Sequence, residues 1–402
     1  MKGKKFILFF GIIFYLIYGK IIHSLMVGEI RNYEIIEDKI IIITGASSGI
    51  GLEAAKELAN LRATVIFACR DKDGTEKIIE ELIKQTKNNK LYFIELDLEK
   101  SESILSFIEQ FKKQFKYLDI LINNAGIADY DIEYVNGIEK IVKVNQIGWV
   151  LLTDQLIDLF NEKGRIINIV SHMYTWIKDK VDIIKAFKGD LDYRYAISQY
   201  FKVSSSLFLQ QFLKEQNKNI KVLLLAPGAV KTEIFEKSLK NQFILRFLVQ
   251  IMKFIMSPFL LTPNEACQTY LYAALRPYDQ IQEEELYNFN KAAKVHQDVI
   301  KLNQGQEIYE ISIKLGLKDI EQPNISNIKL NYNGIKNNQK TSWPECVGKS
   351  IQQAIQIIKK DQPNLIISVL PEGSIVTMDY RIDRVRIFHN QKGQVIQVPH
   401  IG

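Results

Sequence analysis

The chain has 402 residues, which is room for more than one domain, since a domain commonly holds about 100–200 residues. Its hydrophobic content of 47% is that of a globular protein, and its net charge of +6 is small and spread, which argues against nucleic-acid binding. The three cysteines lie far apart and predict neither a disulfide framework nor a metal site.

The N-terminal residues have the pattern of a membrane anchor. Lysines near the start precede two apolar runs, 6–19 and 21–27, with Lys20 between them. As one helix, residues 6–27 would span a hydrocarbon core of ~30 Å, and no small-residue cleavage site follows them. We therefore expect residues 1–30 to be an uncleaved transmembrane helix. Lysines lie on both sides of it, so its orientation stays open.

The remaining chain divides into two patterned regions. Between residues 36 and 320, apolar runs alternate with helical segments, which predicts a Rossmann-type, doubly wound parallel sheet in the α/β class. A polar stretch at 321–340, rich in Asn, Gln and Lys, is interpreted as a linker. Residues 341–402 regain helix and strand patterning and predict a small α+β domain. The strands predicted in the first domain are 40–44, 64–69, 91–97, 120–123, 165–170 and 221–226.

A glycine-rich turn follows the first predicted strand, and a helical pattern begins where the turn ends. Its residues are Thr44-Gly45-Ala46-Ser47-Ser48-Gly49-Ile50-Gly51. Glycines let a main chain approach phosphates closely, and a helix N-terminus offers free N–H groups and a partial positive charge. Taken alone, such a turn is also typical of any tight strand-to-helix connection. In this position it predicts a site for the pyrophosphate of a dinucleotide.

Polar and small residues follow the other predicted strands at their carboxyl ends. Arg70 follows the second strand, where an arginine favours a ribose 2′-phosphate, so NADP(H) is the expected cofactor. Singly, the other candidates are typical of turns and caps, but open parallel sheets bind ligands at this edge. At the strand ends they are Asp97, Leu98, Asn123, Asn124, Ala125, Gly126, Ser171, Pro227, Gly228, Val230 and Thr232. Asn145 lies in the middle of a predicted helix, and Tyr195 and Ser198 open a further one.

In this order and spacing, the motifs make residues 40–317 resemble the short-chain dehydrogenase/reductase superfamily, and within it the retinol-dehydrogenase-like group. The resemblance implies an NADP-dependent oxidoreductase for a lipophilic alcohol or carbonyl, such as a retinoid or steroid, at an endomembrane such as the endoplasmic reticulum. The cofactor contacts that it implies are the pyrophosphate for Gly45, Ser47, Ser48, Gly49, Ile50 and Gly51, the 2′-phosphate for Arg70, the adenine for Asp97 and the nicotinamide amide for Thr232, with Leu98, Asn123, Asn124, Ala125, Gly126, Tyr195, Pro227, Gly228 and Val230 as further contacts.

The resemblance also implies a catalytic set of Asn, Ser, Tyr and Lys, of which Asn145, Ser171 and Tyr195 are present, while Gln199 stands at the lysine position. A lysine ammonium at ~4 Å stabilises a tyrosinate by about 4 kcal/mol at an effective dielectric of 20, or roughly three pKa units. Glutamine supplies no such charge. We therefore expect slow turnover, and the alternative of a catalytically weak, NADP-binding scaffold stays open.

Two other lysines lie nearby in the sequence. Lys178 completes a literal Tyr-x-x-x-Lys with Tyr174, but that motif begins three residues after Ser171, so we interpret it as chance. Lys202 lies seven residues after Tyr195, about 20° around a helix but roughly 10 Å along it. Its long side chain leans back toward the helix N-terminus, which leaves a contribution to the site open, although we expect none.

The stretch at 243–261 is apolar, with Arg246, Gln250 and Lys253 at i, i+4 and i+7. This pattern fits a helix packed on the core. It also fits an amphipathic lid on a membrane surface that admits a lipophilic substrate, and the N-terminal anchor favours this second interpretation.

In the second domain, Ser350 predicts a helix cap and Pro363 a helix end. The predicted strands are 365–370, 384–389 and 395–398. A connection at 371–383 is long for a domain of this size, and long ordered connections are usually functional.

This domain resembles the potato inhibitor I family of serine protease inhibitors. The resemblance rests on Ser342-Trp343-Pro344-Glu345, Val347-Gly348-Lys349-Ser350, the run Ile375 to Arg386, and Val398-Pro399 with Gly402. It implies a reactive loop that includes Thr377 and Tyr380, a reactive bond between Met378 and Asp379, and support of the loop by Arg384 and Arg386. It also implies a serine protease of chymotrypsin or subtilisin type as the partner. If the first domain is a scaffold, it displays this inhibitor at a membrane.

Overall fold

A computed structural model describes residues 35–129, 131–231, 260–281, 285–288, 291–321, 342–363, 365–374 and 384–399. The chain divides into two compact units, Met1–Ser326 and Asn327–Gly402. The predicted anchor at 1–30, nearly all of the apolar stretch at 243–261 and the predicted reactive bond lie outside the described residues. Within the described ranges, no helix has both the length and the apolar character needed to cross a membrane.

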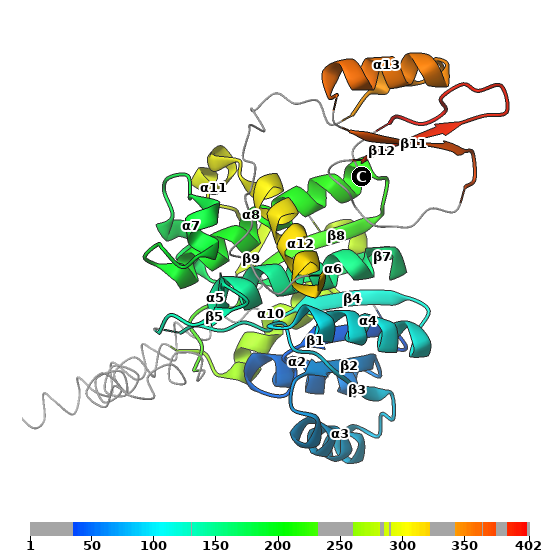
Figure 1. The fold of residues 1–402 in the computed structure, drawn as a ribbon. Coiled ribbons are helices and arrows are strands. Elements are labelled where there is room, and N and C mark those ends of the chain that lie inside the picture. The colour runs from blue at the N-terminus through cyan, green and yellow to red at the C-terminus, as the bar shows by residue number, and fades with distance from the viewer. Residues whose placement is uncertain are drawn as a thin grey trace, which may run out of the picture. The chain divides into compact units, whose positions relative to one another are not determined.

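The described part of the first unit is built on an eight-stranded sheet (Figure 1). In spatial order its strands are β10 (Lys291–Lys294), β9 (Glu285–Asn288), β8 (Ile220–Ala226), β7 (Phe160–Ile169), β4 (Leu118–Asn123), β1 (Ile40–Thr44), β2 (Thr64–Cys69) and β3 (Leu91–Glu95). Neighbouring strands pair in parallel, except that β9 and β10 are antiparallel. The strand order reverses between β1 and β4, and open parallel sheets bind ligands at the carboxyl ends of the strands at such a point.

Helices cover both faces of this sheet (Figure 1). One face carries α2 (Gly49–Asn60), α3 (Lys72–Thr86) and α10 (Pro263–Leu275). The other carries α4 (Ser101–Gln114), α6 (Trp149–Leu156), α8 (Arg194–Glu215) and α12 (Gly305–Glu321). Shorter helical segments are α5 (Lys140–Val142), the π-helix η1 (Lys143–Gly148), the 3₁₀ turns η2 (Ile157–Leu159), η3 (His172–Trp176) and η5 (Tyr278–Gln280), α7 (Ile183–Phe187) and α11 (Gln297–Leu302).

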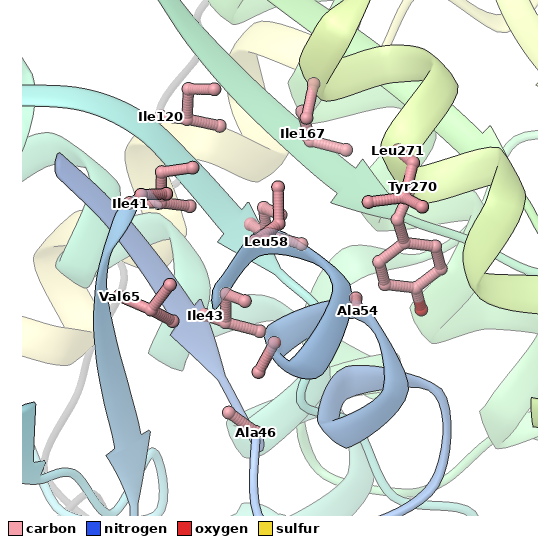
Figure 2. Packing of buried hydrophobic residues seen from close by; sticks show 14 of the residues in the cluster. Ile41, Ile43, Ala46, Ala54, Leu58, Val65, Ile120, Ile167, Tyr270 and Leu271 are labelled. Atoms are coloured by element: carbon pink, nitrogen blue, oxygen red, sulfur yellow. The ribbon is translucent and has the colours of Figure 1, made fainter. Parts of the chain in front are cut away.

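The strand β1 has the composition of a strand that is buried on both faces. Its four isoleucines and one threonine are β-branched, and all five are buried, as expected for a parallel strand with helices on both faces. Ile41 and Ile43 pack with α2 and α10, as Figure 2 shows. Ile40 and Ile42 point the other way and pack with α4 and α6. The sheet therefore holds the first βα turn rigidly in place.

Two hairpins were not predicted from the sequence. The strands β5 (Tyr134–Val135) and β6 (Ile138–Glu139) are joined by Asn136 and Gly137, with φ of 52° and 78°. Two such residues with positive φ are the pattern of a type I′ turn, so the Asn-Gly dipeptide was the signal missed. The β9–β10 hairpin gave no comparable signal, because the sequence of β10, Lys-Ala-Ala-Lys, has low strand propensity. In the structure, β9 also pairs with β8.

In the second unit, α13 (Ile351–Asp361) is capped by Ser350, as predicted. The Ser350 hydroxyl accepts from Gln353 N and the Gln353 side chain accepts from Ser350 N, which makes a capping box. The strands β11 (Ile366–Pro371) and β12 (Arg384–His389) pair in parallel. A small core that includes Trp343 lies beneath them, with the 3₁₀ turn η7 (Pro344–Cys346) at its edge.

The predicted strand at 395–398 is wrong. Val395 makes a single bridge to His389 and no ladder. Its main-chain N–H donates to Lys349 O at 2.9 Å and its carbonyl accepts from Gly348 N at 2.8 Å. The main-chain hydrogen bonds of Val395 are therefore taken up by the loop that precedes α13, and Ile396 N donates to β12, at Phe388 O.

Candidate active site

The glycine-rich turn leads from β1 into α2 and is shaped for an anion. Gly45 and Gly49 have φ of +67° and +59°, and a Cβ built on Gly49 meets nothing within 4 Å. A Cβ on Gly51 would lie 2.5 Å from Asn124 Nδ2, so this position has no room for a side chain. The N-cap residue Ser48 makes no side-chain cap, and the first turn of α2 has no acidic residue. The N–H groups of this turn thus suit a pyrophosphate.

Asn124 joins this turn to the end of β4. Its Nδ2 donates to Thr44 O at 2.8 Å and to Gly45 O at 3.3 Å. Its Oδ1 accepts from the hydroxyl of Tyr270 at 2.7 Å. Tyr270 is fully buried on α10 and faces α2 near Ala54 (Figure 2). One amide therefore ties the main chain of the turn to α10, the helix that packs against α2.

The ribose and adenine end of the predicted site lies after β2 and β3. The Arg70 side chain is 64% exposed, and its Nη1 lies 3.2 Å from Glu99 Oε1. Such an exposed ion pair contributes about 0–1 kcal/mol, so Arg70 remains available to a phosphate. Asp97 Oδ1 accepts from Glu99 N at 3.1 Å, and its Oδ2 lies 3.6 Å from Lys100 Nζ. The buried Leu98 lies against Gly148, where a Cβ would come within 2.8 Å of it.

Asn145 lies in the π-helix η1, where the sequence predicted only a helix. Its side chain exchanges two hydrogen bonds of 2.8 Å with the main chain of Ile127. Its Nδ2 also donates to Ser198 Oγ at 3.1 Å, and Ser198 Oγ donates to Tyr195 O at 2.8 Å. Asn145 thus connects the segment after β4 to the first turn of α8. Single π-helical turns frequently occur at functional sites.

Ser171 and Tyr195 are brought together, as expected. Their side chains are hydrogen-bonded, yet burial raises the pKa of Tyr195 to about 12, against the opposite effect of this bond. Gln199 points its Oε1 at the main-chain N–H of Ser171, at 2.9 Å. Gln199 therefore positions Ser171 without adding a charge. With its raised pKa, Tyr195 is protonated at neutral pH.

Lys202 is buried at 2% exposure and extends toward β4. Its Nζ donates to Asn123 O at 3.1 Å and lies 5.9 Å from the ring centroid of Trp149. Desolvation lowers its pKa to about 7, which leaves it only partly charged at neutral pH. Asn123 in turn donates from Nδ2 to Thr153 Oγ1 and Asn168 Oδ1, at 3.0 and 2.8 Å. Lys202 thus belongs to a polar network beneath the end of β4.

The side chains of Tyr174 and Lys178, which form the literal Tyr-x-x-x-Lys motif, contact residues near the start of α11. Tyr174 is buried, and its hydroxyl accepts from His296 N at 3.3 Å. Lys178 Nζ lies 3.1 Å from Asp298 Oδ2. Both side chains contact the segment that begins α11, in keeping with the interpretation of the motif as chance.

Some of the remaining predicted site residues lie at the ends of strands, and others lie outside the described residues. Ala125 N donates to Thr44 Oγ1 at 2.9 Å, and a Cβ on Gly126 would lie 3.2 Å from Asn145 Oδ1. Gly228, after Pro227 at the end of β8, has a φ of +86°, and Val230 bridges to Leu261. Thr232, Thr377, Met378, Asp379 and Tyr380 lie outside the described residues. Among the described residues, no group of three or more His, Cys, Asp or Glu side chains is placed to hold a metal ion.

A Rossmann sheet with a glycine-rich turn and a Ser–Tyr pair at its carboxyl edge defines a nicotinamide-dependent oxidoreductase class. The short chain dehydrogenase family model matches residues 39–175, and the potato inhibitor I family model matches residues 335–402. The chain belongs to the short-chain dehydrogenase family and ends in a domain of the potato inhibitor I family. The first domain thus implies a small-molecule substrate, and the second a protease partner.

Several curated relatives are dehydrogenases. Retinol dehydrogenase 11 of Mus musculus is 32% identical over 283 residues, which cover 68% of this chain and 85% of the relative. Retinol dehydrogenase 12 of Bos taurus is 33% identical over 243 residues, covering 59% and 73%. Polyprenol dehydrogenase of Homo sapiens is 28% identical over 269 residues, covering 64% and 79%.

Solved structures share the fold. An uncharacterised protein from Mycobacterium paratuberculosis superposes with a TM-score of 0.53 at 21% identity, covering 71% of this chain and 96% of its own. At this identity the likeness concerns the fold alone.

Proposed function

We propose that residues 36–320 use NADP(H) to interconvert a lipophilic carbonyl, such as a retinoid or steroid, and its alcohol. The observation that carries the proposal is the hydrogen-bonded pair of Ser171 and Tyr195, at the sheet edge that also holds the glycine-rich turn. Relatives named as retinol and polyprenol dehydrogenases support a lipophilic substrate.

The residues divide the chemistry among themselves. A bound nicotinamide cofactor would supply the hydride. In the proposed mechanism, the Ser171 hydroxyl orients the substrate oxygen and Tyr195 gives a proton to the oxygen of the reduced product. A tyrosine with a pKa of about 12 is present as the acid at neutral pH, so it is better suited to carbonyl reduction than to alcohol oxidation.

The competing function is a cofactor-binding scaffold with little or no turnover. Gln199 favours it, because its carbonyl contacts Ser171 N and no cation is supplied at that position. Measuring NADPH oxidation by the purified chain with retinals, steroid ketones and simple aldehydes separates the two functions. Tight NADPH binding without oxidation in the whole panel would select the scaffold.

For the second domain, we propose serine protease inhibition through a substrate-like bond between Met378 and Asp379. The family match spans the whole domain, and the pairing of β11 with β12 fixes both ends of the connection that carries this bond. Arg384 and Arg386 alternate on β12 with the core residue Val385, so their side chains leave the strand on the side opposite to that of Val385. We propose that they hold the reactive loop from below.

We expect the double substitution Arg384→Ala and Arg386→Ala to convert the inhibitor into a substrate. Losing both guanidinium forks would leave the loop free to move, and an unrestrained loop is cleaved and released instead of remaining bound. The measurement follows subtilisin activity and cleavage of the chain over time. The double variant Arg384→Lys and Arg386→Lys keeps both charges and loses both forks, so its rate of cleavage should lie between those of the unsubstituted chain and the double Ala variant. Equal inhibition by all three proteins would exclude this role of the two arginines.

We further propose that residues 1–30 anchor the chain in an endomembrane, and that the domain boundaries lie at 320 and 341. The apolar character of residues 6–27 supports the anchor. Alkaline extraction of membranes should leave the full chain in the pellet and release a variant that lacks residues 1–30. Release of both proteins would rule the anchor out.

We expect Arg70→Ala to abolish most of the preference for NADPH over NADH. Arg70 is the exposed cation at the end of β2, and its loss should weaken NADPH binding by about tenfold to a hundredfold while leaving NADH binding unchanged. Titration of both cofactors by fluorescence measures this. Arg62→Ala, which removes an exposed arginine bonded to Lys87 O, is the matched control. Equal affinity of the unsubstituted chain for both cofactors would contradict the assignment.

We expect Tyr270→Phe to weaken NADPH binding by about threefold to tenfold, the effect of one lost buried hydrogen bond. The ring and its packing remain, but Asn124 Oδ1 loses its donor and the amide is freer to leave the turn. Tyr117→Phe, on the exposed segment before β4, is the control for a lost hydroxyl. NADPH affinity unchanged by Tyr270→Phe would show that Asn124 holds the turn unaided.

A further inference from the structure

Two exposed aromatic side chains lie close in the chain to Ser171 and Tyr195, and the mechanism above uses neither. Trp176 is 58% exposed and Tyr193 is 70% exposed. Their rings meet edge to face, with centroids 6.2 Å apart and planes at 87°. Trp176 ends η3, the turn that begins directly after Ser171, and Tyr193 precedes Tyr195 by two residues. We call Trp176 and Tyr193 the aromatic rim.

The exposure of Trp176 is specific to this place. The other two tryptophans of the chain, Trp149 and Trp343, are 1% and 0% exposed and lie in hydrophobic cores. Isolated exposed apolar residues are common, but a paired aromatic surface beside a candidate site is typical of ligand binding.

The main chain is strained where it presents Tyr193. This residue is the N-cap of α8 and has a φ of 59° and ψ of 34°, a left-handed conformation that is unusual for a bulky side chain and costs on the order of 1–2 kcal/mol. The next residue, Arg194, holds it there. Its Nη1 lies 2.8 Å from the buried Glu139 Oε1 and donates to Asp131 O at 3.0 Å. Strain that is held in place by its surroundings is often functional.

The same contact brings a second segment with exposed apolar side chains to the start of α8. Asp131 is followed by Ile132, which is 52% exposed, and Tyr134 is 54% exposed. Because Arg194 bonds Asp131 O, this segment lies beside the start of α8. Apolar side chains from two separate segments therefore border the start of α8, the helix that carries Tyr195.

We propose that the aromatic rim binds the extended apolar part of the substrate, a flat polyene, isoprenoid or steroid hydrocarbon, while the carbonyl or hydroxyl end meets Ser171 and Tyr195. The inference rests on the proposed oxidoreductase function and deepens it. Because η3 packs against α8, the rim on these two elements lies beside the segments that carry Ser171 and Tyr195. A steroid or isoprenoid hydrocarbon would gain from the apolar area that it buries on the rim, and a conjugated polyene would add about 0.5–1.5 kcal/mol per aromatic contact beyond that area.

The test is binding of all-trans-retinol to the full chain, followed by the emission that retinol gains on leaving water. We expect Trp176→Ala and Tyr193→Ala each to weaken binding by about threefold to tenfold, and Trp176→Phe, which keeps an aromatic ring, to stay within about twofold of the unsubstituted chain. Tyr117→Ala is the matched control, because Tyr117 is an exposed aromatic at the amino end of β4, on the opposite edge of the sheet.

The titration is run with and without NADPH, so the rim is judged on retinol binding whether or not the cofactor binds. Failure to bind NADPH would count against the proposed function and leave the rim result to be read separately. Equal retinol affinities for Trp176→Ala, Tyr193→Ala and Tyr117→Ala would overturn the rim. It would also be overturned if Trp176→Ala reduced binding to phosphatidylcholine vesicles while retinol affinity stayed unchanged, since the pair would then be a membrane contact.

Discussion

Replacing Gln199 with lysine is expected to raise the rate of carbonyl reduction by about tenfold or more, because a nearby ammonium lowers the pKa of a tyrosine toward the working pH. Burial raises the pKa of Tyr195 to about 12, and only the hydrogen bond with Ser171 opposes it. A charge at position 199, one helical turn after Tyr195, would act in the same direction as that bond. The pH at which the rate is half-maximal should fall together with the gain in rate.

The matched control for this variant is Gln199→Met. Both substitutions remove the carbonyl that accepts from Ser171 N at 2.9 Å, so they share any cost of releasing Ser171. Only the lysine adds a charge. A rate increase of the same size in both variants would show that Gln199 restrains Ser171, and that electrostatics is not the cause. No increase in either would favour the scaffold.

Lys202 offers an internal check on the same argument. Its Nζ is bonded to Asn123 O and its pKa is lowered to about 7, so we expect Lys202→Met to leave any residual rate within about twofold in both the unsubstituted and the Gln199→Lys backgrounds. The expected cost of the substitution is to stability, because Asn123 O loses a buried donor. A large loss of rate with unchanged melting temperature would show that Lys202 supplies the missing charge.

Met378→Lys is expected to redirect the inhibitor domain from chymotrypsin-like and subtilisin-like proteases to trypsin-like ones. An unbranched apolar side chain suits a hydrophobic primary pocket, whereas lysine suits a pocket with a buried carboxylate. The inhibition constant for trypsin should fall by about a hundredfold or more, because an unpaired buried charge on either side costs several kcal/mol. The same substitution should weaken inhibition of chymotrypsin.

The control adds the same charge elsewhere in the domain. Gln391 is exposed in the turn after β12, and Gln391→Lys should leave the inhibition of both proteases unchanged. If neither the unsubstituted chain nor Met378→Lys inhibits any of the three proteases at micromolar concentration, the inhibitor proposal fails.

The central strands were predictable because their signal is local. The run at 40–44 is wholly β-branched, the run at 64–69 begins with three β-branched residues, and both match their strands residue for residue. The cap at Ser350 was predictable for the same reason, since a capping box is written within four residues. The predicted strand at 395–398 failed because the main-chain hydrogen bonds of Val395 go to Gly348 and Lys349, in a loop far earlier in the chain.

In the candidate site too, local features could be predicted from the sequence and long-range contacts could not. The pairing of Ser171 with Tyr195 follows from motif spacing, since Ser171 follows a strand at the carboxyl edge of the sheet and Tyr195 lies in the first turn of a later helix. Tyr270 could not be predicted, because its bond to Asn124 links residues 146 positions apart, and only the packing of α10 on α2 brings them together. The direction of Lys202 was equally hidden, since sequence spacing gives its angle around the helix and not the group that its ammonium meets.

The parallel pairing of β11 and β12 has a consequence for an inhibitor that has been cut. Ile366 pairs with Arg384 and Pro371 with His389, so residues 372–383 return the chain along a ladder of about 17–20 Å. Hydrolysis between Met378 and Asp379 would leave one new end attached to β11 and the other to β12, both still bonded into one sheet above one core. Neither end can diffuse away, so each stays at a high effective concentration near the other, in the millimolar range typical of short tethers. A nicked inhibitor domain should therefore keep its shape and its affinity, and rejoining of the bond within a protease complex competes with loss of the pieces.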